Sequence, residues 1–249
     1  MNPFFNVELE NVKTASGRPL PRVRAVVNQE TKEPVSIVSD RYRLVPYRAA
    51  MDLAEQYAES FGTFSQKVSL GRHGGSMVAS FDFRDRSAEV AKDDFVGFRL
   101  LFENSYNASK SVRLWLGALR LICLNGMVSS TGLFDTRLKH VGTTAELKFP
   151  EPAEIVDQFT KTVGHWKNYA KHVVTYKEAQ QIRTEAFEAH LIPEKIVDSP
   201  LGESDKIRVW DIYNDFTQHI THSERAGASP VGKVQRLRKV DRFFRERFN

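Results

Sequence analysis

Two neighbouring runs between Val96 and Met127 constrain the fold more than any other part of the chain. In Phe98–Tyr106 and again in Ser111–Leu116, polar and apolar residues nearly alternate. Such alternation is the period of a β-strand that has one buried and one exposed face. The segment 107–109 separates the two runs with turn-forming residues, so the sequence predicts a β-hairpin here.

The two faces of this predicted hairpin differ in chemistry. Phe98, Leu100 and Phe102 fall on one face, whereas Arg99, Glu103 and Ser105 fall on the other. Successive side chains of a strand point to opposite sides of the sheet. We therefore expect one face to pack against the core, and the charged face to be the working surface of the protein.

Further strands and one helix are predicted before this hairpin. Proline and glycine interrupt residues 1–21, which predicts an extended arm with at most a short strand near Val7–Leu9. Apolar residues recur every three or four positions from Ala50 to Phe61, which predicts a helix that follows Pro46 and ends at Gly62. Strands are expected over 22–29, 34–45, 64–70 and 76–83, a charged loop over 82–94, and another short strand near 132–138.

Past Pro152 the pattern is helical. Apolar stripes predict helices over 155–170, 209–220 and 231–249, with a linker over 191–203. Thr175 and Glu178 form a capping box that opens one more helix. The fold class is therefore α+β: an antiparallel, β-rich region with one long covering helix over residues 1–148, followed by a helical region over 149–249 that ends in a basic helix.

Composition indicates a protein of the cytoplasm. No apolar run approaches the roughly 20 residues of a membrane span, and the first residues lack the pattern of a signal peptide. The single cysteine, Cys123, excludes an intramolecular disulfide. Because it lies in an apolar run, we interpret it as a buried thiol and not as a nucleophile.

Positive charge is concentrated at the end of the chain. The net charge is +5, and residues 231–249 hold seven basic side chains against two acidic ones, so this segment accounts for the whole excess. Such a segment favours an anionic partner, of which nucleic acid is the commonest for a basic protein. The alternatives are a solvated helix face or a surface that docks an acidic protein.

Nucleic-acid binding without sequence preference needs cations that follow phosphates and rings that stack on bases. The predicted strands and the last helix offer both. We predict that phosphates are held by Arg41, Arg43, Lys67, Arg72, Arg99, Lys110 and Arg113, that bases stack on Tyr42, Tyr106 or Trp115, and that the last helix contributes Lys233, Arg236, Lys239 and Arg242. The alternative interpretation is that the rings belong to the core and the charges to a solvated strand face.

Two further features of the sequence could indicate an anion-binding loop or a metal site. Gly71–Gly75 (GRHGG) has glycines that could cradle an anion, but it lacks the Lys-Ser/Thr of a phosphate-binding loop, so a hairpin turn is favoured. His219 and His222 could share a helix face toward a metal ion, as in a nuclease, but no further His or Cys is placed to complete a tetrahedral site. We predict no enzyme activity, no metal and no cofactor.

Leu116–Val128 (LGALRLICLNGMV) is similar to the Arg-x-x-Cys-x-Asn-Gly signature of a family of uncharacterised phage- and plasmid-like proteins. The matching residues are Arg120, Cys123, Asn125 and Gly126, and three more segments resemble the family in the same order: 39–53, 102–114 and 209–222. The resemblance gives these residues no role. From their types alone, Asn125-Gly126 favours a turn and Arg120 a buried ion pair.

This resemblance implies a place in phage or mobile-element DNA metabolism, in the host cytoplasm. The hairpins and helix of the first half also resemble the core of single-strand-annealing recombinases, which pair complementary strands through a basic groove and form rings or filaments. We therefore expect a homo-oligomeric, single-stranded DNA-binding protein that acts in replication, recombination or transcription. The alternative is a module that docks a host or phage replication or transcription protein through the basic last helix.

Overall fold

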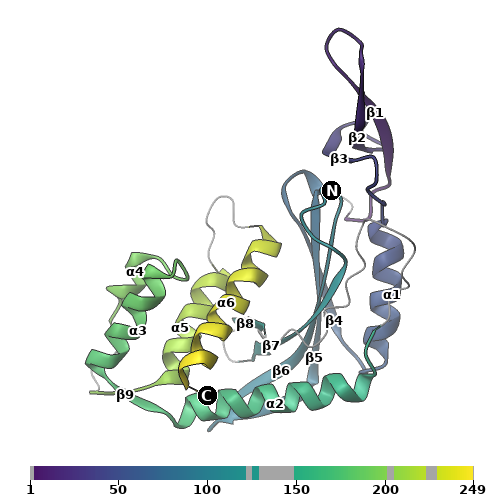
Figure 1. Cartoon of the computed structure of the whole chain (residues 1–249). Helices are drawn as coiled ribbons and strands as arrows, with labels where there is room; N and C mark the ends of the chain where they lie inside the picture. Colours follow the sequence, from purple (N-terminus) through teal and green to yellow (C-terminus); the bar gives the residue numbers. More distant parts are fainter. Residues whose placement is uncertain (1–2, 122–124, 129–148, 201–204, 223–228, 249) are drawn as a thin grey trace.

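The computed structural model describes residues 3–121, 125–128, 149–200, 205–222 and 229–248. At its centre is a five-stranded antiparallel sheet in the order β4-β5-β6-β7-β8 (Figure 1). Its strands are β4 (Ser65–Leu70), β5 (Ser76–Ala91), β6 (Asp94–Ser105), β7 (Arg113–Arg120) and β8 (Asn125–Val128). The predicted hairpin is the β6–β7 pair, in which Leu100 lies opposite Leu116 and Phe102 opposite Leu114.

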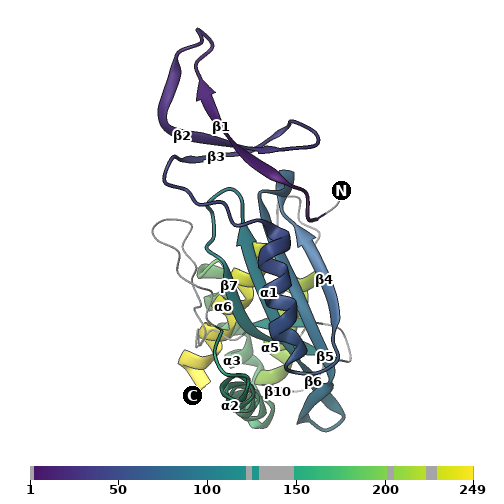
Figure 2. The same cartoon turned by 90° about the vertical axis from the view of Figure 1, so that its right-hand side faces the viewer.

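One face of this sheet forms the core, as the alternation predicted. Phe81, Phe98 and Phe102 are each at most 1% exposed. Helix α1 (Tyr47–Glu59) lies along this face (Figure 2) and buries its small residues, among them Ala50 and Ala54. Small side chains let a helix approach a sheet closely, so the large rings of the strands fill the space between the two layers.

Helix α2 (Pro152–Lys171) crosses one end of the sheet, and its Phe159 meets Phe98 edge to face with 5.3 Å between ring centroids. On the opposite side of the sheet from α1 stand α5 (Val209–His222) and α6 (Pro230–Phe248), which pack against β8 (Figure 1). Both regions of the chain therefore contribute to one hydrophobic core, which extends from Phe5 to Phe244.

The N-terminal residues form a second sheet instead of an extended arm. Strands β1 (Val7–Lys13), β2 (Pro19–Asn28) and β3 (Pro34–Ser39) pair in that order, and the β1–β2 hairpin projects beyond the rest of the molecule (Figures 1 and 2). The prediction of at most a short strand was wrong because the prolines lie at the start of β2, where nothing requires their missing N–H. Strand β3 also ends at Ser39, earlier than predicted.

The predicted charged loop over 82–94 was also wrong. Strand β5 continues through this segment to Ala91 and pairs with β6, with an irregularity between Phe83 and Ser87. Residues 84–87 are exposed, so they need no apolar alternation. The strand resumes its pairing with β6 at Ser87, opposite Gly97, and continues to Ala91, opposite Asp94; the side-chain pattern does not reveal this pairing.

The helical region contains the predicted helices, and in addition one short helix and two short strands. The capping box that opens α3 (Tyr176–Glu188) is present: the Thr175 N–H donates to Glu178 at 2.8 Å, and the Glu178 N–H donates to Thr175 Oγ1 at 3.3 Å. The predicted linker contains the short helix α4 (Glu194–Val197), and Leu191, Ile192 and Ile196 are buried. Two three-residue strands, β9 (Val173–Thr175) and β10 (Lys206–Arg208), pair ahead of α3 and α5.

Two predictions fall outside the described residues: the strand near 132–138 and the buried thiol of Cys123. Among the helices that are described, none is both long enough and apolar enough to cross a membrane.

Candidate nucleic-acid groove

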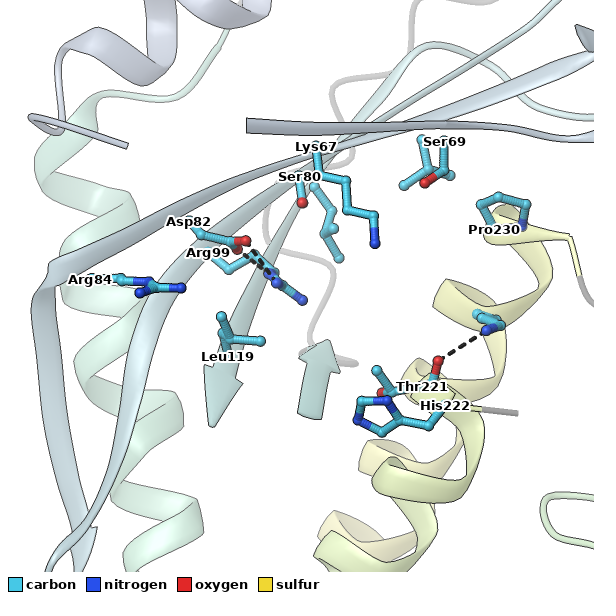
Figure 3. Close-up of a pocket in the computed structure, with 13 residues that line it drawn as sticks. Lys67, Ser69, Ser80, Asp82, Arg84, Arg99, Leu119, Thr221, His222 and Pro230 are labelled. Carbon is cyan, nitrogen blue, oxygen red and sulfur yellow. Dashed lines mark hydrogen bonds and ion pairs between the residues drawn. The ribbon is translucent and has the colours of Figure 1, made fainter. Parts of the chain in front are cut away.

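A groove of about 530 Å³ lies between the charged face of the central sheet and helices α5 and α6 (Figure 3). Three sheet strands supply most of its floor, and the end of α5 and start of α6 supply its wall. The lining residues are Lys67, Ser69, Val78, Ser80, Asp82, Arg84, Arg99, Leu101, Leu119, Thr221, His222, Pro230 and Lys233.

Strand register brings the floor residues together. Lys67 lies opposite Ser80, which lies opposite Leu101, while Asp82 lies opposite Arg99 in the neighbouring row. All of them point away from the phenylalanine-rich core face, because residues two apart on a strand share a side. The sheet face opposite the core therefore carries charged side chains over β4, β5 and β6, as the alternation predicted.

The groove carries more positive than negative charge. Arg99 forms an ion pair with Asp82, in which Nη2 and Oδ2 are 2.9 Å apart. Lys233 donates a hydrogen bond of 2.9 Å to the carbonyl oxygen of Thr221. Lys67 and Arg84 are exposed, and neither makes an ion pair with another described residue. These two cations are therefore available to an anion from solution.

Two glycines give the Arg99 side chain its path across the floor. A Cβ added to Gly117 would lie 3.6 Å from Arg99 Cδ, and one added to Gly126 would lie 3.0 Å from Arg99 Nη1. The Arg99 guanidinium therefore reaches from β6 over β7 toward β8. Gly126 is held there by its N–H, which donates to Thr221 Oγ1 at 3.1 Å.

Three of the predicted phosphate-binding residues line this groove: Lys67, Arg99 and Lys233. Sequence reasoning missed Arg84 and His222. Arg84 continues the two-residue period of Ser80 and Asp82, a signal that was lost when its segment was assigned to a loop. His222 was considered only as a metal ligand, and nothing local indicated that the end of α5 faces the sheet.

The three rings predicted to stack on bases lie in the core instead, because each fills space between elements. Tyr42 is 4% exposed and donates its hydroxyl hydrogen to the Ser105 carbonyl at 2.6 Å. Tyr106 stacks on Tyr47 with 3.7 Å between centroids, and burial raises its pKa to about 12. The third ring, Trp115, is 4% exposed under α6. In this conformation none of them offers a face to a base.

The far end of the charged face is closed. Glu103 is 1% exposed, and Ser105 is fully buried, although both were predicted to lie on the open working surface. Arg238 of α6 lies 3.7 Å above the Trp115 ring and covers this end. Burial raises the pKa of the Glu103 carboxyl, and the neighbouring Trp115 indole and basic side chains offset only part of that effect.

The remaining predicted cations lie elsewhere on the protein. Arg41, Arg43 and Arg72 are exposed on loops, and Arg72 donates a 3.1 Å hydrogen bond to His73. Lys110 and Arg113 are half-buried near the turn between β6 and β7. Those left are Arg236, Lys239 and Arg242, which are exposed on α6. None of these residues lines the groove, so the structure does not unite the predicted set at one place.

The Gly71–Gly75 segment is the turn that was favoured over an anion cradle. It joins β4 to β5 through a short 3-10 turn at Arg72–Gly74. Gly74 has a φ of +70°, and a Cβ there would lie 2.6 Å from the Phe5 ring, so only glycine fits. The segment opens no helix.

Arg120 has a structural role. It makes two hydrogen bonds from Nε to the carboxylate of Asp94, at 2.8 and 3.0 Å, and Trp210 Nε1 donates to the same carboxylate at 2.7 Å. The interpretation of Arg120 as an ion-pair partner is confirmed. This group joins β6, β7 and α5, and so positions the wall of the groove relative to its floor.

The two histidines of α5 do not converge. His222 lines the groove, whereas His219 lines a separate depression beside α3 and α4. In the described part of the chain, no group of three or more His, Cys, Asp or Glu side chains is arranged to hold a metal ion. His219 and His222 therefore do not share one site.

Comparison with known proteins gives one family. The family model described as "Domain of unknown function (DUF932)" matches residues 34–243, a range that includes every residue lining the groove. No curated protein and no solved structure matches the chain.

Proposed function

This chain belongs to the DUF932 family, a domain of unknown function, and we propose that it binds single-stranded DNA in the groove between the central sheet and helices α5 and α6. The observation that carries this proposal is the pair of exposed cations, Lys67 and Arg84, on the groove floor. Cations that face solvent inside a groove attract phosphates and release their counterions. Arg99 and Lys233 add two more positive charges to the lining of the same groove.

The shape and lining of the groove favour a single strand without sequence preference. A volume of about 530 Å³ is that of a small-ligand cleft and cannot enclose a duplex. The cations of the described lining suit the phosphates of any sequence, and the lining contains no asparagine or glutamine, the side chains that pair with adenine. The imidazole of His222, exposed at the wall, provides a ring on which a base can stack.

The biological setting of the proposal follows from the sequence resemblance to phage- and plasmid-like proteins. We place the activity in the host cytoplasm, in replication, transcription or recombination of a phage or mobile element. Strand annealing by a homo-oligomer is compatible with a groove that binds the phosphate backbone of one strand.

The test is fluorescence anisotropy of a labelled single-stranded oligonucleotide and of the matching duplex, each titrated with protein at several salt concentrations. Three to four phosphate contacts predict that log Kobs falls with log salt at a slope of about −2 to −3. The single strand should bind more tightly than the duplex. Absence of binding at low salt, or binding that does not respond to salt, refutes the proposal.

A further inference from the structure

Helix α6 divides its basic residues into two groups. Four are engaged by the protein itself: Lys233 with the Thr221 carbonyl, Arg238 over Trp115, Arg245 with Asp241, and Arg247 with Glu185. The other three, Arg236, Lys239 and Arg242, are exposed and make no ion pair with any described residue. The basic character predicted for this helix is therefore available to a partner only through these three.

The three exposed cations form a stripe. Positions three apart on an α-helix are neighbours on its surface, so 236, 239 and 242 follow one another over about 9 Å of the helix axis. None of them lines the groove described above. We call this surface the α6 stripe.

The stripe begins at a second depression of about 430 Å³, which Arg236 lines. This depression lies between the end of α3, the start of α4, and helices α5 and α6. Its apolar side chains are Leu191, Ile192 and Ile220, each at most 8% exposed, the half-buried Pro193, and Phe187, which is 38% exposed. His190, His219 and one carboxylate, Glu194, complete the rim.

We propose that this depression and the α6 stripe together bind an acidic peptide segment of a partner protein that carries a bulky apolar residue next to its carboxylates. The apolar side chain packs in the depression against Phe187, the most exposed of its apolar residues. The carboxylates follow the stripe from Arg236 to Lys239 and Arg242, each gaining the attraction of an exposed cation.

The charge of the rim makes the proposal specific. Arg236 is the residue shared by the depression and the stripe, so it would contact both parts of the peptide. Glu194 is the carboxylate that opposes an acidic ligand. Removing the charge of Arg236 should therefore lower the affinity for the peptide, and removing the charge of Glu194 should raise it. Burial of apolar surface alone would not produce this pair of opposite effects.

This inference does not depend on the proposed groove. The groove uses Lys67, Arg84, Arg99 and Lys233, whereas the peptide site uses no groove residue. A nucleic-acid strand lying on the stripe is the competing occupant. The experiment therefore measures a peptide and an oligonucleotide with the same set of variants.

The probe is a fluorescein-labelled oligo-aspartate peptide with a C-terminal phenylalanine, titrated with the full chain at low salt and followed by anisotropy. We expect saturable binding that weakens about tenfold in Arg236→Glu and strengthens about two- to threefold in Glu194→Gln. The matched control is Lys177→Glu, the same charge reversal at an exposed residue in the first turn of α3, where a carboxylate suits the helix dipole. A peptide that ends in alanine should bind more weakly.

Two results would overturn the inference. One is absence of peptide binding, or peptide binding that Arg236→Glu leaves unchanged. The other is a loss of oligonucleotide affinity in Arg236→Glu as large as that in Lys67→Glu, which would assign the stripe to nucleic acid.

If the oligonucleotide fails to bind any variant while the peptide binds as described, the groove proposal fails and the peptide site stands. All the substituted residues are exposed, and thermal denaturation checks that each variant is folded.

Discussion

At the scale of single residues, the decisive groups are few and belong to different classes. Lys67 and Arg84 are exposed cations that nothing in the described fold requires. Asp94 is 5% exposed and receives hydrogen bonds from two other elements. Gly117 and Gly126 have no side chain and so leave room for the side chain of Arg99. Each class predicts a different outcome on substitution.

Charge reversal in the groove should weaken DNA binding without weakening the fold. Lys67→Glu and Arg84→Glu each remove one phosphate contact, which lowers the magnitude of the salt slope by about 0.7. The control is Lys92→Glu, the same change at an exposed residue outside the groove. Anisotropy at several salt concentrations separates the three variants. An equal loss of affinity in the control would point to general charge and not to the groove.

The two glycines beside the Arg99 side chain should respond differently to alanine. A methyl group at Gly117 would lie 2.8 Å from the carbonyl oxygen of Met127, which is backbone and cannot easily shift, so we expect a loss of about 1–3 kcal/mol of unfolding free energy. A methyl group at Gly126 meets the flexible end of Arg99, so Gly126→Ala should fold but displace that guanidinium and weaken DNA binding. Urea denaturation measures the stability of the two variants, and anisotropy measures their affinity for DNA. Equal stability of both variants would contradict it.

Asp94 should make the stability of the fold sensitive to acid. Burial by itself would raise the pKa of this carboxyl, but hydrogen bonds from Arg120 and Trp210 outweigh burial and lower its pKa. A lowered folded-state pKa stabilises the protein above the unfolded value of about 3.9, and that stability is lost as pH falls through the folded-state pKa.

Replacing Asp94 with asparagine should therefore cost about 3 kcal/mol near neutral pH, because Arg120 loses the carboxylate that balances its charge. The difference from the natural chain should be constant above about pH 5 and shrink in acid. Urea denaturation over a pH series measures it, with Asp93→Asn, at an exposed residue, as the control. If the difference in unfolding free energy between the two chains grew as pH fell, the pKa of Asp94 would be raised by folding and not lowered.

At the scale of elements, α6 is part of the core and not a detachable basic tail. Val240, Asp241 and Phe244 have no exposed surface, and the Phe244 ring contacts Tyr213 and Phe216 of α5. The projecting β1–β2 hairpin is the opposite case, because the residues around its turn at 14–18 are mostly exposed.

Removal of residues 231–249 should consequently abolish cooperative unfolding, whereas replacing 14–18 with Asn-Gly should leave the melting temperature within a few degrees. Thermal denaturation followed by circular dichroism distinguishes the two truncations. A cooperative transition after loss of α6 would show that the helix is dispensable. Partner docking on α6 therefore has to be tested by surface substitutions and not by deletion.

At the scale of the whole molecule, the β-rich and helical regions are joined by buried contacts. Phe159 packs on Phe98, and Trp210 donates to Asp94. We expect residues 1–148 and 149–249, expressed separately, to lack cooperative unfolding, and the two fragments mixed to regain part of it. Calorimetry of each fragment and of the mixture tests this. Independent transitions of both fragments would show that the two regions are separate folding units.

Local patterns predicted the elements whose cause is local. The alternation in β6 and β7, the stripe of α1 and the capping box at Thr175 all depend on neighbours in the chain, and each is present. The continuation of β5 over 87–91 and the β1–β2 hairpin depend on backbone pairing across a turn, which leaves no periodic pattern in exposed side chains, so the sequence did not indicate their extent. The groove is a separate case, because it brings together Lys67 and His222, which lie more than 150 positions apart in the chain.

The sequence by itself therefore determined the α+β class, the two faces of the central hairpin and the excess of basic residues in the last helix, since periodicity and charge are local properties. Only the tertiary structure decided which of those residues are available. It buried Tyr42, Tyr106 and Trp115 between elements, engaged four of the seven cations of α6 internally, and left Lys67 and Arg84 facing solvent in a groove. The physical reason is that burial depends on which elements pack together, and that packing joins residues more than a hundred positions apart.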